Sequence, residues 1–390
     1  MTERLEHWLA QLPPDYGTDP EGKKALLVGI ESAQCHGEEL TLELDELVLL
    51  LSNLGVETLG RMTFSRPKPD VRGFFGQGQR QKIKDQLDEL GANLLVSNDT
   101  LTALQTTTLR EETLCDVWDR PLVITQIFER RASSAESKAQ LGLVSLRSQL
   151  PSLRGLGQQM SRSGAGIGTR GSGETEYERH RRKLSRQERV LSSKIKDSAK
   201  AREQRRISRQ KKGLETFALV GYTNSGKTTL LSSLTGDKSI VGENKLFATL
   251  DPKTRRLVWP DGKVALVTDT VGFLRRLPPQ LEASFRATLE EIKEATALVL
   301  VLDAHDPTID HTCQVVLDTL EALGTEELPL VLVLNKIDTM SPERVESLKA
   351  HFERAHERVF ALSAQTGEGV EELKSYLWTL VKGEGTWQKA

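Results

Sequence analysis

Short apolar runs alternate with amphipathic stretches in the first third of the chain. Three runs have the length and composition of buried strands: Ala25–Ile30, Val56–Phe64 and Ala92–Val96. Residues 43–53 and 80–90 instead place apolar residues at helical spacing. Because strands that alternate with helices form sheets that are at least partly parallel, we predict a small N-terminal α/β domain over residues 1–119.

The middle of the chain shows two blocks of helical pattern. Apolar residues recur at helical spacing over Ile124–Leu150, and Thr175–Lys212 is charged and compatible with a helix. A glycine-rich stretch at about residues 155–174 lies between them. We therefore predict an antiparallel helical hairpin over residues 120–213, with arms about 45–55 Å long. Gly213 would close the second helix, as glycines commonly do at that position.

Residues 214–383 return to alternating strands and helices. Four apolar runs recur, the last three of which end in polar residues: Thr216–Val220, Val264–Asp269, Ala297–Asp303 and Leu330–Asn335. This pattern is typical of a doubly wound, mostly parallel sheet, in which ligands bind at the carboxyl ends of the strands. The predicted fold class is therefore α/β, with a small N-terminal α/β domain, a long helical hairpin and a larger C-terminal α/β domain. Residues 384–390 form a short tail.

A phosphate-binding motif follows the first strand of the C-terminal domain. Residues 221–228 read GYTNSGKT and match the spacing GxxxxGK[ST] between a strand and a helix. In such a loop, backbone N–H groups curl around phosphate oxygens, Lys227 reaches the β- and γ-phosphates, and the Thr228 hydroxyl binds Mg²⁺. The expected nucleotide contacts here are Gly221, Tyr222, Thr223, Asn224, Ser225, Gly226, Lys227, Thr228 and Thr229.

Three further elements select the nucleotide. Asp269 ends a strand and would hold Mg²⁺, while the Gly272 N–H would reach the γ-phosphate. Asn335-Lys336-Ile337-Asp338 also ends a strand, and the Asp338 carboxylate can accept two hydrogen bonds from guanine but not from adenine. Ser363-Ala364 would place a backbone N–H on guanine O6. Together the four elements predict a P-loop GTPase domain that binds GTP and GDP and hydrolyses GTP with Mg²⁺.

Four residues are candidates for the catalytic step: Lys227, Thr249, Gly272 and Asn224. Thr249 is the candidate switch threonine that would bind Mg²⁺ when γ-phosphate is present, and Thr254 is a nearby alternative. Phe273 stands where many GTPases carry a glutamine that orients the attacking water, so intrinsic hydrolysis should be slow. The Asn224 amide could hold K⁺ beside the phosphates, or it could only stabilise the loop.

Charge is distributed unevenly along the chain. The net charge is −2, yet residues 154–212 hold 18 Lys or Arg against 6 Asp or Glu. Such an excess is typical of a surface that meets a polyanion, most often nucleic acid. A solvated basic face, or pairing with neighbouring acids, is the alternative. The first candidates for RNA contact are Arg162, Arg170, Arg179, Arg181 and Arg182.

Cysteine usage and hydropathy exclude several other classes. The three cysteines lie far apart and form no CxxC pair, which argues against a zinc site or a disulfide framework. The apolar runs fall far short of the roughly 20 residues that a membrane-spanning helix needs. The N-terminus lacks the pattern of a secretory signal. We therefore expect a cytoplasmic protein.

The motifs together resemble one family closely. The segments GYTNSGKTT, LFATLDPKTRRL and DTVGF, and the tip AGIGTRGSGETEYERHRR, look like HflX, a ribosome-associated bacterial GTPase family. The likeness extends from near Gly76 to the end of the GTPase domain. It implies binding to the 50S ribosomal subunit through 23S rRNA and GTP-dependent splitting of stalled or idle 70S ribosomes, often linked to stress. A monomer is expected.

One departure and two alternatives accompany this resemblance. The family often carries GKGK where this chain has Gly76-Gln77-Gly78-Gln79, so a second nucleotide site in the N-terminal domain would lack its lysines. The first alternative function is a GTPase that acts in assembly or checking of the large subunit. The second is a GTP-regulated protein that binds or remodels rRNA.

Overall fold

A computed structural model describes residues 19–31, 37–146, 172–211, 213–237, 239, 247, 250–276 and 291–382. The chain divides into two compact units, each considered by itself. Among the described residues, the first unit holds 19–130 and 172–179, and the second holds 131–146 and 180–382.

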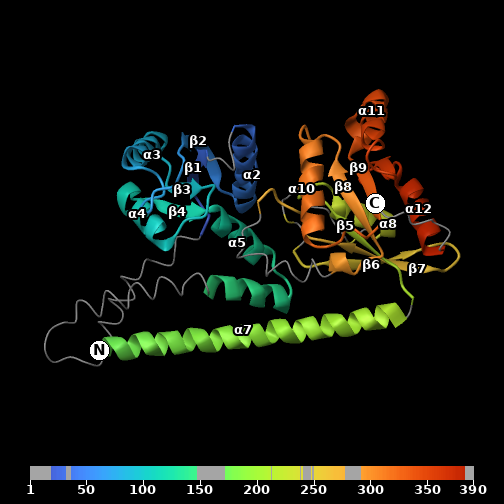
Figure 1. Cartoon of the computed structure of the whole chain (residues 1–390), viewed down its shortest axis with the longest axis horizontal. Coiled ribbons are helices and arrows are strands. Elements are labelled where there is room, and N and C mark those ends of the chain that lie inside the picture. Colours follow the sequence, from blue (N-terminus) through green and yellow to red (C-terminus); the bar gives the residue numbers. More distant parts are fainter. Residues whose placement is uncertain are drawn as a thin grey trace. The chain divides into compact units, whose positions relative to one another are not determined.

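The first unit is built on a four-stranded sheet whose strand pairs are all parallel (Figure 1). In the order β2-β1-β3-β4, the strands are β2 (Glu57–Ser65), β1 (Lys24–Glu31), β3 (Leu94–Ser97) and β4 (Asp116–Asp119). The helices are α2 (Glu38–Leu54), α3 (Gln77–Leu90), α4 (Ala103–Thr113) and α5 (Arg120–Arg131). The predicted strands and helices of this region are confirmed.

Apolar spacing explains why these elements form. Helix α2 buries leucines three and four residues apart, such as Leu40, Leu44, Leu47 and Leu51, and ends at Gly55, whose φ of 81° lies in the left-handed region. The sequence did not indicate β4 and α4, because β4 has four residues and α4 buries only one apolar side chain together with Gln105 and Thr113.

The second unit contains a six-stranded sheet in the order β10-β9-β8-β5-β7-β6, parallel except for the β6–β7 pair. Its strands are β5 (Thr216–Val220), β6 (Lys253–Val258), β7 (Val264–Asp269), β8 (Ala297–Asp303), β9 (Leu330–Asn335) and β10 (Val359–Leu362). Its helices include α8 (Lys227–Thr235), α10 (Ile309–Ala322), the 3₁₀ helix η1 (Ile337–Thr339), α11 (Pro342–Phe352) and α12 (Val370–Lys382). The long helix α7 (Ser172–Lys211) belongs to this unit from residue 180 onward. The predicted doubly wound fold is confirmed.

Both faces of this sheet are covered. Along β5, Phe217 and Leu219 pack with residues of α8 and α12, whereas Ala218 and Val220 pack with residues of α10. Because side chains alternate between the faces of a strand, this fully buried strand contributes to two cores at once. The carboxyl ends of β7, β8 and β9 carry the polar residues Asp269, Asp303 and Asn335, and the phosphate loop follows β5.

The predicted hairpin departs from its expected form in one place. The sequence predicted one helix over Ile124–Leu150, but α5 ends at Arg131 and a second helix covers residues 135–146. The break falls at residues 132–134, where two serines bond to a carboxylate described below. Helix α7 confirms the basic helix; its 40 residues span about 60 Å at 1.5 Å per residue. The glycine-rich tip up to residue 171 lies outside the described residues.

Helix 135–146 runs antiparallel to α7. Glu136 forms an ion pair with Arg202, and a Cβ placed on Gly142 would lie 3.4 Å from Leu191 Cδ1. Gly213 adopts a φ of 60°, as expected for a glycine that closes a helix.

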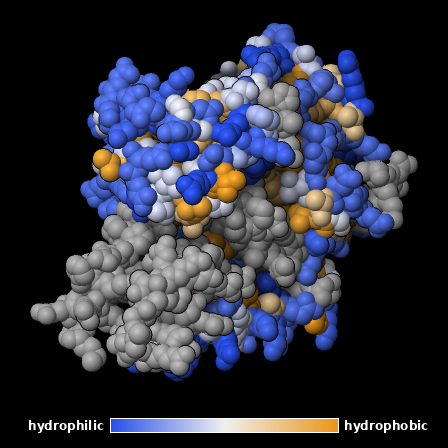
Figure 2. Space-filling view, turned by 60° about the vertical axis from the view of Figure 1, so that its left-hand side comes forward, coloured by the Kyte–Doolittle hydropathy of each residue, from blue (hydrophilic) through white to orange (hydrophobic). Residues whose placement is uncertain are grey.

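The surface of the described residues that Figure 2 shows is mostly hydrophilic. The large apolar side chains that the described residues expose, such as Val71, Leu114 and Val258, come from separate parts of the chain. Within the same described ranges, helices are too short or too polar to cross a membrane. The clearest surface feature of the described residues is therefore the positive charge of α7, not an apolar patch.

Candidate nucleotide-binding site

The phosphate loop joins β5 to α8, and its glycines occupy positions that a side chain would block. Gly221 has a φ of 145°, and a Cβ there would collide with the carbonyl oxygen of Val301 in β8. Gly226 has a φ of 93°, and its Cβ would collide with the Asn335 side-chain amide. The backbone therefore lies against β8 and β9, which places the loop at the carboxyl ends of the strands.

Lys227 and Thr228 begin α8 and point into the loop. Lys227 is buried, and its Nζ donates to the carbonyl oxygens of Gly221 at 3.1 Å and Tyr222 at 2.7 Å. Burial lowers the pKa of Lys227 to about 8, an effect that the nearby Asp269 carboxylate opposes. An anionic phosphate oxygen would stabilise the charged ammonium at this position. Thr229 is half-buried in the same first turn.

Thr228 and Asp269 provide adjacent oxygen ligands. The Thr228 hydroxyl donates to Asp269 Oδ2 at 2.7 Å, and Asp269 is completely buried at the end of β7. A hydroxyl and a carboxylate side by side next to a phosphate loop are the donors that Mg²⁺ prefers. This pair fits the metal role predicted for both residues.

The segment after β7 is bonded directly to the phosphate loop. Phe273 N donates to Gly221 O at 3.0 Å, and Thr223 N donates to Phe273 O at 3.1 Å. A Cβ on Gly272 would lie 2.7 Å from Thr223 Cα, so only glycine fits this approach. The Phe273 side chain is half-buried and packs against the apolar cluster that includes Val220. Its role here is packing, and its ring offers no group that could orient water.

Asn335, part of an element predicted to select guanine, connects the phosphate loop to the segment after β10. Its Nδ2 donates to Ser225 O at 2.8 Å, and its Oδ1 accepts from Ala364 N at 2.9 Å. The Ala364 N–H, one of the two backbone N–H groups of the Ser363-Ala364 element predicted to reach guanine O6, is therefore bonded to Asn335 in this structure. Ser363 is buried beside it, at the end of β10.

The remaining base-site residues lie just beyond β9. Lys336 has a φ of 70° and donates from Nζ to Asp303 Oδ2 at 2.7 Å. Asp338 is exposed in η1. The carboxylate predicted to read the base is thus open to a ligand rather than used within the fold.

The structure describes only some of the remaining predicted catalytic and RNA-binding residues. Asn224 is exposed at the loop with a φ of 64°. Thr254, the alternative switch threonine, lies in β6 with its hydroxyl 3.0 Å from that of Thr268. Thr249 lies outside the described residues, as do Arg162 and Arg170. Arg179 and Arg182 are exposed on α7, whereas the Arg181 side chain lies outside the described part.

Two contacts near this site escaped sequence reasoning. The Tyr222 hydroxyl accepts from Arg275 N at 2.9 Å, which ties the phosphate loop to the segment after Gly272. Asp251 accepts hydrogen bonds from serines more than 110 residues earlier in the chain. The pattern of serines before a helical run could have indicated a helix start, but nothing local identifies the distant carboxylate.

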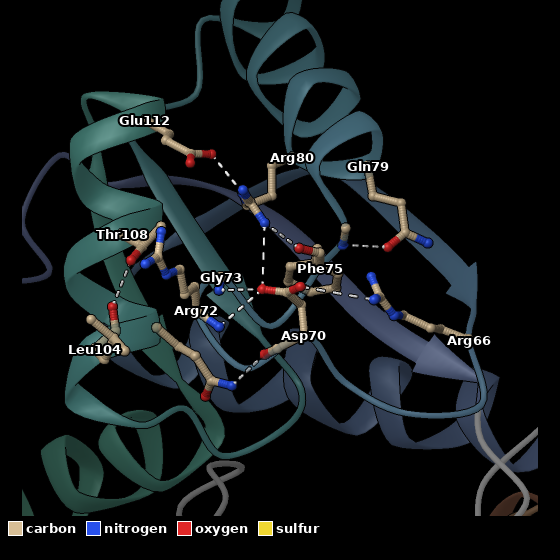
Figure 3. Close-up of polar contacts among 12 residues, drawn as sticks. Arg66, Asp70, Arg72, Gly73, Phe75, Gln79, Arg80, Leu104, Thr108 and Glu112 are labelled. Atoms are coloured by element: carbon tan, nitrogen blue, oxygen red, sulfur yellow. Dashed lines mark hydrogen bonds and ion pairs between the residues drawn. The ribbon is translucent and has the colours of Figure 1, made fainter.

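The stretch Gly76-Gln77-Gly78-Gln79 and the loop before it are held in place by contacts within the first unit (Figure 3). The Gln79 side chain accepts from Gly76 N at 2.8 Å and so caps α3. Asp70 accepts from the N–H groups of Arg72 and Gly73, bonds that lower the pKa of its carboxyl, and it pairs with Arg80. These contacts close a loop before α3 and do not require a ligand.

A doubly wound sheet, a GxxxxGKT loop, a buried aspartate at the end of β7 and an Asn-Lys-x-Asp element define a P-loop GTPase. Family models agree: residues 216–336 match the one described as "50S ribosome-binding GTPase". Residues 41–129 match "GTP-binding GTPase N-terminal" and residues 131–209 match "GTP-binding GTPase Middle Region".

Curated relatives specify the family. The chain is 40% identical over 333 residues to GTPase HflX of Caldanaerobacter subterraneus, covering 85% of this chain and 76% of that one. It is 37% identical over 367 residues to GTPase HflX of Escherichia coli, covering 93% of this chain and 84% of that one. This chain belongs to the HflX family of GTPases, and it hydrolyses GTP to GDP and phosphate.

Solved structures also show a likeness. A GTP-binding protein from Sulfolobus solfataricus in complex with GDP is 23% identical and covers 93% of this chain and 100% of its own. Its TM-score is 0.45, a value at which the likeness supports no further conclusion about this chain.

Proposed function

We propose that this GTPase binds the 50S ribosomal subunit and the 70S ribosome through 23S rRNA and dissociates stalled or idle 70S ribosomes in a GTP-dependent manner. It would act in the cytoplasm as a monomer. The observation that carries this proposal is α7, which holds 14 Lys or Arg against 6 Asp or Glu in a chain of net charge −2. Membership of the HflX family and the ribosome-binding description of the matched GTPase model support it.

The proposed RNA-binding surface begins with Arg179 and Arg182. Both side chains are exposed on α7, as contact with phosphates requires. Arg162, Arg170 and Arg181 are assigned to the same surface by their place in the sequence. Phosphate contacts of this kind would make binding strongly dependent on salt.

The proposed catalytic arrangement uses residues at the carboxyl ends of β5 and β7. Thr228 and Asp269 would hold Mg²⁺, with Thr249 as a third ligand. Lys227 and the Gly272 N–H would contact the γ-phosphate, and Asp338 would read guanine. The metal neutralises charge on the phosphates when it is bound. Because the Phe273 ring packs on apolar residues, a group from outside this segment would have to orient the attacking water.

Asn224 is the proposed ligand for K⁺. Its side chain is exposed at the phosphate loop, where an amide oxygen could hold a monovalent cation near the β- and γ-phosphates. Faster GTP hydrolysis in K⁺ than in Na⁺ would support this role, and Asn224→Ala should remove the difference. Equal rates in the two salts would leave Asn224 as a loop residue.

Light scattering of purified 70S ribosomes tests the splitting activity. Wild-type protein with a non-hydrolysable GTP analogue should lower the 70S signal, and GDP should not. Arg179→Ala/Arg182→Ala should slow the loss, whereas Lys82→Ala/Arg344→Ala, which removes two exposed charges on other helices, should not. An unchanged 70S signal would contradict splitting, and retained binding to 50S subunits would then favour the assembly role.

A further inference from the structure

We propose that the Asp251 carboxylate is a positioning residue that couples the nucleotide state of the GTPase sheet to the helical hairpin. The coupling runs through the start of helix 135–146, which Asp251 holds. It rests on GTP binding alone and needs no assumption about the ribosome.

The first step is the contact itself. Asp251 Oδ2 accepts from Ser133 N at 3.1 Å, Ser133 Oγ at 2.6 Å and Ser134 N at 2.8 Å. Asp251 Oδ1 accepts from Ser134 Oγ at 2.6 Å and also from Ser137 Oγ. We call these four residues the Asp251 latch. A carboxylate at a helix N-terminus also meets the positive end of the helix dipole.

The chemistry of the latch favours a charged carboxylate. Both carboxylate oxygens of Asp251 accept only from N–H and O–H donors, an arrangement that suits the ionised form. Five bonds that converge on one group form and break together more readily than one at a time. Release of the whole latch is therefore the two-state change that the proposed coupling requires.

The second step connects the latch to the nucleotide site. Asp251 lies two residues before β6. Lys253 at the start of β6 lies opposite Asp269 at the end of β7 in the register of this antiparallel strand pair. Asp269 in turn accepts from Thr228 of the phosphate loop. One strand pair therefore separates the latch from the carboxylate assigned to the metal, so a shift of β6 with nucleotide acts directly on Asp251.

The third step connects the latch to the long basic helix. Glu136, in the first turn of helix 135–146, forms an ion pair with Arg202 of α7, and both side chains are only 15% exposed. Farther along, Gly142 lies against Leu191. Moving the start of helix 135–146 therefore changes its packing on α7, which carries the basic surface.

Reciprocity makes the coupling measurable with purified full-length protein and nucleotides. If nucleotide shifts the latch, breaking the latch must change the ratio of affinities for GDP and a non-hydrolysable GTP analogue. Ser134→Ala/Ser137→Ala removes both hydrogen bonds to Asp251 Oδ1 from the side remote in sequence from the nucleotide motifs. Asp251→Asn weakens the latch from the other side. We expect each to change the ratio about fivefold or more, and the triple variant to add little beyond either.

Matched controls separate coupling from general damage. Asp261→Asn removes another carboxylate beside β6, and Ser193→Ala removes an exposed hydroxyl of α7; both should leave the ratio unchanged. Ratios within about twofold of wild type in folded latch variants would overturn the proposal. Should the variants not fold, hydrogen exchange of residues 135–146 in the wild-type protein decides. Exchange that differs between GDP and the analogue supports the coupling, and equal exchange overturns it.

Discussion

Substitution of Gly226 by alanine tests how the phosphate loop is joined to the guanine-selecting element. Gly226 precedes α8 with a φ of 93°, and Gly236 follows the same helix with a φ of 69°. Both backbones are left-handed, so alanine is strained at either position. Only Gly226 has a close neighbour, the Asn335 amide, whereas nothing lies within 4 Å of a Cβ on Gly236.

The expected costs follow from these surroundings. Gly236→Ala should lower the free energy of unfolding by about 1–2 kcal/mol through backbone strain alone. Gly226→Ala adds displacement of Asn335, whose bond to Ser225 O is buried; leaving such groups unpaired costs about 1–3 kcal/mol. We therefore expect a total loss of about 2–5 kcal/mol for Gly226→Ala.

Urea unfolding and binding of a fluorescent GDP analogue measure both effects. Because ligand stabilises only the unit that binds it, the transition that GDP shifts identifies the second unit. Gly226→Ala should lower the midpoint of that transition more than Gly236→Ala does, and it alone should weaken GDP binding by about tenfold or more. Equal losses of stability and affinity in the two variants would refute the role given to Asn335.

Three further predictions concern other parts of the chain. Asp338→Asn should sharply weaken GTP binding and favour xanthine nucleotides in competition assays; retained preference for GTP would refute base reading by Asp338. Arg120 is 2% exposed and bonds to Glu46 at 2.7 Å, so Arg120→Ala should destabilise the first unit by about 3–5 kcal/mol in urea unfolding. Because the pKa of Asp251 falls from 3.8 to about 2 on folding, its stabilisation is complete above the higher value. It should be lost as pH falls toward 2, and urea midpoints between pH 5 and 2 should decline less steeply for Asp251→Asn.

Local pattern predicted what local interactions determine. The strands β1, β5, β8 and β9 are long apolar runs, and the GxxxxGKT loop needs only its own glycines and flanking elements, so both could be read from the sequence. The same holds for α7, because a long, mostly charged segment without proline cannot form a buried strand and is compatible with a solvated helix.

Distant partners explain the failures. The break between Arg131 and residue 135 depends on Asp251, far along the chain, and no helical periodicity reveals it. The bond from Ala364 N to Asn335 joins the segment after β10 to β9, and no local pattern indicates it. That Phe273 cannot orient water stays a prediction from its side-chain chemistry, whereas its packing against the core beside Val220 became visible only in the fold.

Sedimentation with purified 50S subunits tests the central claim most directly. Full-length protein should pellet with the subunits in the presence of a non-hydrolysable GTP analogue and largely remain in the supernatant with GDP. The bound fraction should fall steeply as salt increases, because phosphate contacts release counterions. Failure to pellet with the analogue, or equal pelleting with GDP and the analogue, would contradict a GTP-controlled ribosomal function for this chain.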